Sequence, residues 1–339
     1  GEFLSAADGE QVLKLAAKEE FEYAEVDELG TVVEKDYTPY HINQVLALKL
    51  VNRDAIAQAD LKIVVDAVNS VGGVVIPALL RALGVKEIIE LNCEPTGHFA
   101  HNPEPIPENL TQIAAKMKES RADLGIVVDP DVDRLALISE NGEMFGEEYT
   151  LVAVADYVLK HTPGNTVSNL SSSRALKDVT EAYGQQYHAA AVGEVNGVAE
   201  MKRTHSVIGG EGNGGVIYPE SHYGRDALVG VGLFLSHYVA QSKKMTELKS
   251  TYPPYFISKN KMTLSPDMDV DKILEGLKER YATEKVTDID GVKIDFAQGW
   301  VHLRKSNTEP IIRIYSEAKD EAAANQLAEE VIAAAKSTL

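Results

Sequence analysis

Three aspartates, Asp129, Asp131 and Asp133, alternate with a proline and a valine directly after an apolar run of the chain. Side chains at i, i+2 and i+4 cannot share one face of a helix, but they can converge in a tight loop. Converging carboxylate oxygens suit a hard cation such as Mg²⁺. The run before them, residues 124–128, predicts a buried parallel strand, and open α/β sheets place their chemistry at the carboxyl ends of such strands. The pattern therefore predicts a Mg²⁺ site.

The same acidic residues are compatible with two alternatives. One is an acidic turn on the surface. The second is a calcium loop of the EF-hand type, but the glycine and the distal glutamate of that loop are missing from this stretch. Two further patterns in the chain favour the cation site.

The first of these patterns is a glycine-rich stretch, residues 209–215, which holds Glu211 and Asn213. Five glycines among seven residues let the backbone adopt positive φ or approach a ligand closely. A carboxylate and a carboxamide in such a loop can hydrogen-bond adjacent sugar hydroxyls. On this stretch alone, a tight surface turn is the simpler interpretation.

The second pattern lies between residues 304 and 313, where hydroxyl groups, an amide and two guanidinium groups are concentrated. Bidentate arginines together with neutral donors from a turn are what a phosphate-binding site needs. The residues concerned are Arg304, Ser306, Asn307, Thr308 and Arg313. A polar hairpin loop with flanking charges is the alternative.

The elements that must position these residues follow two rhythms. Buried-strand patterns occupy residues 61–66, 88–91, 124–128, 135–138, 166–169, 187–190 and 206–210. Helix patterns occupy residues 74–83, 108–120, 149–160, 174–183 and 226–241. Strands and helices that alternate at this spacing predict sheets with parallel strands and crossover helices.

The two ends of the chain differ from this middle part. Near the N-terminus the patterns predict a helix over 5–19 capped by Ser5, a strand near 29–33 and a helix over 41–57. Beyond the prolines at 253 and 254, strands cluster and helices segregate, which predicts an α+β unit. Its expected strands are 255–264, 292–296, 300–304 and 311–316, and its expected helices are 270–280 and 320–336. We therefore divide the chain at 1–40, 41–148, 149–253 and 254–339.

Composition narrows the class of protein. The chain has 339 residues and a net charge of −19, which argues against nucleic acid or an anionic membrane as a partner. An anionic small molecule remains possible, because it needs only a local patch of positive charge. The single cysteine, Cys93, excludes an internal disulfide and fits a reducing cytoplasm. No stretch approaches the ~20 apolar residues that span a bilayer.

In their order and spacing, the three motifs resemble those of the α-D-phosphohexomutase family. They read Asp-Pro-Asp-x-Asp-Arg, then Gly-Glu-x-x-Gly, then Arg-x-Ser-Asn-Thr-Glu-Pro-x-x-Arg. The family includes phosphoglucomutase, phosphomannomutase and phosphoglucosamine mutase. The resemblance covers essentially the whole chain and implies mixed-sheet α/β domains followed by a C-terminal α+β domain. It also implies that the substrate is a sugar phosphate and the cofactor Mg²⁺.

The resemblance implies a role for each matching residue. The aspartates at 129, 131 and 133 would bind the metal, and Arg134 would contact the reacting phosphoryl group. Glu211, with Asn213, would bind sugar hydroxyls. The phosphate that is not reacting would be held by Arg304, Ser306, Asn307, Thr308 and Arg313.

Two further residues have competing interpretations. Glu194 stands where some members have a histidine, so it is expected to carry a proton or contact a hydroxyl, unless it is a solvent-exposed charge. Arg225 can reach an anionic substrate, or it can belong to a helix entry with Asp226 as the N-cap.

The chain departs from the family at the phosphorylated serine of the first domain. Its Thr-x-Ser-His-Asn-Pro motif has no counterpart, and the similar string that starts at Ala100 has alanine in place of the serine. Residues 1–40 are thus expected to be a remnant of the phosphoserine domain. The predicted function is interconversion of hexose or aminohexose 1-phosphate and 6-phosphate, with this fragment inactive. The alternatives are a sugar-phosphate-binding relative that does not catalyse and another Mg²⁺-dependent phosphotransferase.

Overall fold

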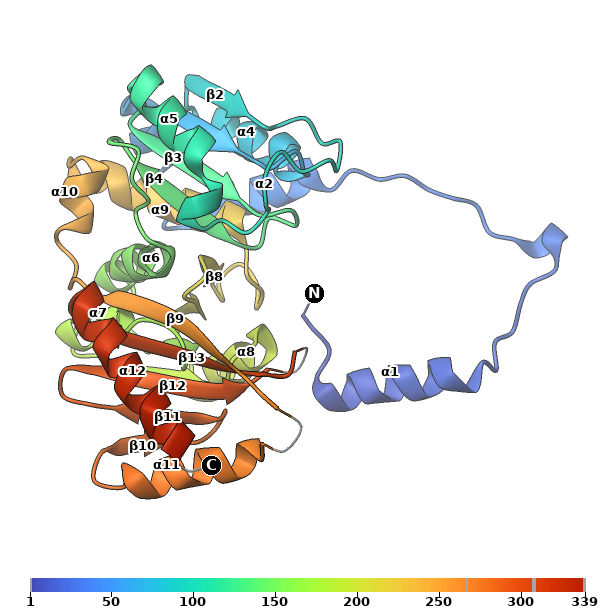
Figure 1. Cartoon of the computed structure of the whole chain (residues 1–339). Coiled ribbons are helices and arrows are strands. Elements are labelled where there is room, and N and C mark those ends of the chain that lie inside the picture. The colour runs from blue at the N-terminus through green and yellow to red at the C-terminus, as the bar shows by residue number, and fades with distance from the viewer. Residues whose placement is uncertain (1, 266–267, 307–308, 338–339) are drawn as a thin grey trace.

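The computed structural model describes residues 2–265, 268–306 and 309–337. Within these residues the strands form three sheets, which Figure 1 shows one after another from the α2 end of the molecule to the C-terminus. Their strand orders are β2-β1-β3-β4, β6-β5-β7-β8 and β10-β11-β12-β13-β9. No described helix is long and apolar enough to cross a membrane.

The acidic stretch lies between two strands of the first sheet. Its strands are β1 (Lys62–Asp66), β2 (Glu87–Leu91), β3 (Leu124–Val128) and β4 (Leu135–Ser139). The crossover elements are α4 (Gly72–Leu83), the short η2 (Pro107–Asn109) and α5 (Thr111–Ser120). β1, β2 and β3 are parallel, whereas β4 runs antiparallel to β3. The aspartate loop, residues 129–134, is therefore the turn between a buried parallel strand and a strand that runs back beside it.

The second sheet repeats this plan. Its strands are β5 (Thr166–Asn169), β6 (Tyr187–Ala190), β7 (Ile208–Glu211) and β8 (Gly215–Ile217). Its helices are α6 (Glu147–His161), α7 (Ala175–Ala182), α8 (Glu194–Thr204) and α9 (Ala227–Gln241). The glycine loop, residues 209–215, lies at the antiparallel turn from β7 to β8.

The turns of the two sheets touch each other. The Leu135 N–H donates to the Gly214 carbonyl at 3.0 Å, and Arg134 forms an isolated antiparallel bridge with Gly215. Gly214 has φ +92°, and a Cβ there would lie 2.4 Å from the Leu135 carbonyl oxygen. Only glycine fits this contact, which places the aspartate loop beside the glycine loop.

The third sheet is antiparallel throughout. Its strands are β9 (Phe256–Thr263), β10 (Lys285–Thr287), β11 (Val292–Asp295), β12 (Gly299–Lys305) and β13 (Ile311–Ala318). Apolar residues of one face pack with α11 (Val270–Arg280) and α12 (Glu321–Ser337). We call each sheet with its helices a unit. Polar residues of this third sheet contact the second unit: Lys293 Nζ donates to the Leu170 carbonyl at 2.8 Å, and Glu317 Oε1 accepts from Arg174 N at 3.0 Å.

The N-terminal segment differs most from the expectation. The helix capped by Ser5 is confirmed as α1 (Ala6–Lys18), but none of its residues is buried. The predicted strand near 29–33 is wrong, because the chain from 19 to 37 has only the short η1 (Val26–Glu28) and its apolar side chains are exposed. Figure 1 shows this segment as an arm that leaves the body before α2. With no neighbouring strand, β-branched residues there have nothing to pair with.

The predicted helix over 41–57 is also wrong as a single element. The structure has α2 (Thr38–Ala47) and α3 (Arg53–Gln58), separated by five residues. Asn52 accounts for the interruption: its side chain caps α3 by accepting from Ala55 N at 3.1 Å, while its own N–H donates to Ser236 Oγ at 2.9 Å. A tertiary contact thus decided where the helix breaks. Most other predicted elements are confirmed to within about two residues, but α8, β8, β10 and α10 (Met245–Lys249) were not predicted.

Asp226 begins the buried helix α9, as the cap interpretation expected. Its Oδ1 accepts from Val229 N at 3.1 Å, and its Oδ2 lies 2.7 Å from His41 Nε2 and 2.9 Å from His222 Nε2. Burial acts to raise the pKa of Asp226, but the hydrogen bonds of the two histidines outweigh it and lower this pKa below 3.8. The hydrogen bond to Asp226 raises the pKa of His41 above 6.5.

These shifts predict how His41 contributes to stability at different pH values. A raised histidine pKa stabilises the fold below the unfolded value and loses this effect as the pH rises through the folded value. We expect His41→Gln to lower the melting temperature more at about pH 5.5 than at about pH 8.5. Thermal denaturation of both proteins at the two pH values measures this, and an equal loss at both would contradict it.

Candidate active site

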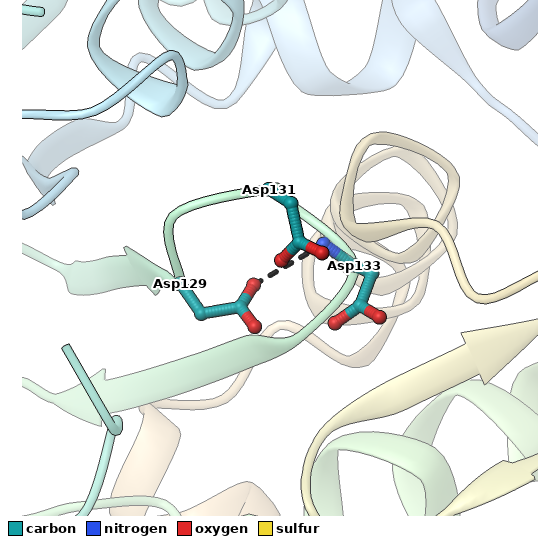
Figure 2. A group of neighbouring side chains, drawn as sticks. All are labelled: Asp129, Asp131 and Asp133. Carbon is teal, nitrogen blue, oxygen red and sulfur yellow. Dashed lines mark hydrogen bonds between the residues drawn. The ribbon is translucent and has the colours of Figure 1, made fainter. Parts of the chain in front are cut away.

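The aspartate loop folds around the carboxylate of Asp129 (Figure 2). Asp129 is 1% exposed, and its Oδ1 accepts the backbone N–H groups of Asp133 at 3.2 Å and Arg134 at 3.0 Å. Val132 has φ +63°, which turns the chain back on itself. One carboxylate oxygen from each of the three aspartates lies within 4.8 Å of the others. The predicted convergence of the three side chains is therefore present.

The charge of this loop is balanced in part by two arginines. Arg134 Nε lies 2.5 Å from Asp129 Oδ2, and Arg225 Nη2 lies 2.5 Å from Asp133 Oδ2. Burial and the neighbouring aspartates outweigh the opposing effect of Arg225 and raise the pKa of Asp133 to about 7. Crowded carboxylates of this kind fit a small divalent cation, which would supply the missing positive charge.

Arg225 connects the aspartate loop to the second unit. Besides Asp133, its guanidinium group contacts Glu194 Oε2 through Nε at 2.7 Å and Glu211 Oε2 through Nη1 at 2.8 Å. The arginine side chain is 18% exposed. Three carboxylates from three separate segments thus share one positive charge at the junction of the first two units.

Glu211 is held firmly by its neighbours. Oε1 accepts from Asn169 Nδ2 at 3.1 Å and Gly193 N at 3.3 Å, while Oε2 accepts from Arg225 Nη1 at 2.8 Å and Asn213 Nδ2 at 3.3 Å. A carboxylate has about four acceptor positions, so its capacity is fully used. A sugar hydroxyl bound by Glu211 would have to replace one of these donors or add to them at an angle.

A cavity of about 190 Å³ joins residues of all three predicted motifs. Arg134 comes from the aspartate loop, Glu211 and Asn213 from the glycine loop, and Arg304 from β12. The cavity is lined by Glu104, Arg134, Glu147, Glu148, Asn169, Ser171, Ser172, Val192, Glu211, Gly212, Asn213, Lys259, Arg304 and Tyr315. Residues more than 150 positions apart in the sequence therefore face one space.

The C-terminal sheet brings positive charge to this space. Arg304 stands directly opposite Arg313 on the neighbouring strand, and Arg313 stands opposite Lys261 on the next. Opposite residues of antiparallel strands share a face, so the three cations form a row across the sheet. Arg304 Nε is buried and has no hydrogen-bond partner among residues 2–265, 268–306 and 309–337. An unpaired guanidinium N–H beside the cavity is suited to an anion.

The structure describes only part of the predicted phosphate clamp, residues 304–313. Ser306 is buried, and its Oγ accepts from Glu309 N at 3.3 Å. Arg313 is half-exposed, with Nη2 3.4 Å from Glu309 Oε2. Asn307 and Thr308 lie outside the described residues.

Two predicted residues lie at neighbouring cavities. Glu194 lines a cavity of about 260 Å³ with Lys202 and Phe3. Arg225 lines one of about 450 Å³ with Asp131 and His41. Because the Glu194 side chain is only 7% exposed and bonds Arg225, the solvent-exposed interpretation of this residue is wrong.

The sequence patterns did not indicate several residues of the cavity wall. Glu148 accepts from Ser173 N at 2.8 Å, and burial raises the pKa of its carboxyl group to about 8. Lys259 Nζ pairs with Glu147 at 2.9 Å. Tyr315, opposite Lys259 on the next strand, lines the cavity beside it. Alternation along β9 and β13 is a weak signal for Lys259 and Tyr315, since every second position of an antiparallel strand shares a face.

Comparison with family models agrees with this arrangement. Phosphoglucomutase/phosphomannomutase alpha/beta/alpha domain II matches residues 39–142, domain III matches 146–255 and the C-terminal domain matches 260–334. A phosphoglucomutase/phosphomannomutase of Thermococcus kodakarensis is 36% identical over 322 residues, which cover 94% of this chain and 70% of the relative. The chain belongs to this family. Its fold is the one that the sequence motifs implied.

Other relatives carry related names. A phosphoglucosamine/phosphogalactosamine mutase of Sulfurisphaera tokodaii is 32% identical over 321 residues, 92% of this chain and 70% of the relative. A crystal structure of a phosphoglucomutase/phosphomannomutase family protein from Burkholderia thailandensis has a TM-score of 0.84 at 25% identity, covering 99% of this chain and 71% of the other. An N-acetylphosphoglucosamine mutase of Aspergillus fumigatus, at 15% identity and a TM-score of 0.57, shares the fold over 88% of this chain and 65% of its own. The family is thus one of sugar-phosphate mutases.

The contacts of Arg225 predict opposite effects on stability and on cation binding. Arg225→Gln leaves Glu194 and Glu211 without a cation, so we expect the free energy of unfolding to fall by about 2 kcal/mol. The same change removes a positive charge next to Asp133, so Mg²⁺ should bind ~10-fold more tightly. Calorimetric titration and thermal denaturation measure the two effects.

Arg225→Lys is the matched control, because it keeps the charge but cannot reach three carboxylates at once. It should lose stability with no gain in Mg²⁺ affinity. A parallel fall of stability and Mg²⁺ affinity in the glutamine variant would contradict the expected competition.

Proposed function

We propose that these residues supply the metal, sugar and phosphate sites of a phosphohexomutase that interconverts the 1-phosphate and 6-phosphate of a hexose or aminohexose. The observation that carries the proposal is the cavity shared by Arg134, Glu211 and Arg304. Its lining differs in chemistry from one side to the other: Arg304 and Lys259 of the C-terminal sheet suit a phosphate, while carboxylate and amide groups of the glycine loop suit hydroxyls. The names of the relatives support the same reaction.

We propose that Asp129, Asp131 and Asp133 hold a Mg²⁺ ion. The support is the convergence of one carboxylate oxygen from each of the three aspartates within 4.8 Å. The Aspergillus fumigatus relative was solved with GlcNAc-6P and magnesium. When bound, the ion would neutralise charge on the transferring phosphoryl group.

The protein's own residues would then orient the substrate. Arg304, with Arg313 and the turn residues of the clamp, would hold the phosphate that does not react. Arg134, whose side chain reaches from the aspartate loop into the cavity, would contact the phosphate that does. Holding both ends supplies binding energy and alignment without any covalent role for these groups.

Glu194 is our candidate for carrying a proton or contacting a hydroxyl. Its Oε2 lies 2.7 Å from Nε of Arg225. Arg225 also contacts Glu211, which lines the cavity. In this proposal Arg225 links Glu194 to the substrate region, because it contacts both carboxylates.

The phosphoryl donor would be a serine in the Ser-His-Asn-Pro motif of the family. Residues 1–339 contain no such string. We therefore propose that these residues bind Mg²⁺ and sugar phosphates without turning them over. Calorimetry with Mg²⁺ and glucose 1-phosphate tests the binding. Absence of heat in both titrations would reject it.

Turnover is tested on a protein that joins these residues to a domain with the serine motif. Glucose, mannose and glucosamine 1-phosphates are the substrates to assay. Formation of a 6-phosphate from any of them supports the mutase. Binding without turnover of all three would instead support the sugar-phosphate-binding relative that does not catalyse.

The phosphate role of Arg304 gives a sharper prediction. We expect Arg304→Gln to weaken glucose 1-phosphate binding by ~10-fold to ~100-fold, since a charged hydrogen bond contributes about 1.5–3 kcal/mol. Lys305→Gln is the matched control: it removes the same charge one position along β12, on the opposite face of the strand. It should change the affinity by less than ~3-fold. Equal losses would mean that only the net charge of the sheet matters.

A further inference from the structure

Ser171 lies in the loop after β5 and lines the 190 Å³ cavity. Its Oγ is 2.9 Å from Nδ1 of His302, a residue of β12 that is 1% exposed. The other ring nitrogen of His302, Nε2, is 2.7 Å from the backbone carbonyl oxygen of Asp290. A serine of the second unit is thus joined to a buried imidazole of the C-terminal sheet.

The partner of Nε2 determines where the imidazole proton lies. A carbonyl oxygen can only accept, so Nε2 must carry the hydrogen and donate it to Asp290. A second proton would make the ring positively charged, which is unfavourable because the ring is buried beside the ammonium group of Lys293. Burial, with a smaller contribution from Lys293, outweighs the hydrogen bond to Asp290 and lowers the pKa of His302 to about 4. Nδ1 is therefore bare and accepts.

It follows that Ser171 donates its hydroxyl proton to His302. The hydroxyl oxygen then presents only lone pairs to the cavity. A ligand atom that meets this oxygen must itself bring a hydrogen. A phosphate oxygen without a proton is repelled there, whereas a hydroxyl or amino group is accepted.

The neighbouring serine is different in this respect. Ser172 Oγ donates to Asn169 Oδ1 at 3.1 Å and accepts from Gly212 N at 3.0 Å, so both of its functions are used inside the protein. Asn169 also accepts from Ser171 N at 3.0 Å and donates to Glu211 Oε1 at 3.1 Å. One amide side chain therefore fixes Ser171 and Glu211 in a common framework.

We propose that Ser171 is a specificity residue of the cavity: with its proton held by His302, it accepts a hydrogen bond from a sugar hydroxyl or amino group and does not bind phosphate. The inference rests on the proposed mutase function and assigns part of its substrate selection. His302 acts through Ser171 and is a positioning residue. The wall that carries Ser171 therefore offers an acceptor to hydrogen donors, and the row of cations on the C-terminal sheet offers positive charge to anions.

The test uses calorimetry of the 339-residue chain with Mg²⁺ present. The ligands are glucose 1-phosphate, its 2-, 3- and 4-deoxy analogues, and inorganic phosphate. We expect Ser171→Ala to weaken glucose 1-phosphate by ~5-fold to ~10-fold, because one hydrogen bond is lost. One deoxy analogue, which lacks the hydroxyl that Ser171 accepts from, should bind both proteins equally. Inorganic phosphate should also bind both equally.

Two further variants separate this role from a structural one. Ser172→Ala breaks the internal framework and should weaken every sugar ligand to a similar degree. His302→Leu frees the Ser171 proton, so the preference for glucose 1-phosphate over the critical deoxy analogue should shrink. If His302→Leu does not fold, as thermal denaturation will show, the deoxy comparison in Ser171→Ala alone decides.

Two results would overturn the inference while leaving the mutase proposal intact. One is a uniform loss of affinity for glucose 1-phosphate and all three deoxy analogues in Ser171→Ala. The second is a loss of inorganic phosphate binding in that variant, which would make Ser171 a phosphate donor. If the unsubstituted chain binds no sugar phosphate at all, the proposed function fails first and the inference fails with it.

Discussion

One guanidinium group makes the arrangement of this site electrostatically possible. Asp133, Glu194 and Glu211 come from three segments, and three carboxylates brought together in a poorly hydrated place would repel one another strongly. Arg225 lies between them with a different nitrogen directed at each, at 2.5, 2.7 and 2.8 Å. The planar guanidinium serves several acceptors at once, which an ammonium group does not do as well. The aspartate loop and the glycine loop can therefore be neighbours at low solvent exposure, and the cavity between them follows.

The backbone also holds the aspartate loop and the glycine loop together. Both loops are turns from a buried strand to an antiparallel edge strand, and the two turns share the hydrogen bond from Leu135 N to the Gly214 carbonyl. The glycines of the second loop were expected to let the backbone approach a ligand. At Gly214 the close approach is instead to β4 of the first unit, where a Cβ would lie 2.4 Å from a carbonyl oxygen. Part of the glycine content thus serves the contact between two protein units.

The sequence predicted what is local and left out what is not. The apolar run at 124–128 and the acidic residues after it predicted β3 and the convergence of Asp129, Asp131 and Asp133, because strand, turn and ligands are consecutive. The break between α2 and α3 depends on Ser236, 184 residues from Asn52, and no local pattern encodes it. The same holds for Ser171 and His302, which are 131 residues apart and meet only because the third sheet docks on the second unit. Glu194 was recognised as a candidate, but its partner Arg225 follows it by 31 residues and required the fold.

Under the proposed function, a sugar that carries phosphate at either end would have to fit this cavity in two orientations. Charged donors on the C-terminal sheet and acceptors on the second unit would serve both, because either orientation would put a phosphate near Arg304 and hydroxyls in the middle. Specificity must then come from groups that read the middle of the ring without attracting its ends. An acceptor with its proton held elsewhere has this property, whereas an ordinary serine could rotate and donate to a phosphate. The buried imidazole behind Ser171 removes that freedom, so the polarity of a single hydroxyl separates recognition of the ring from recognition of the phosphate.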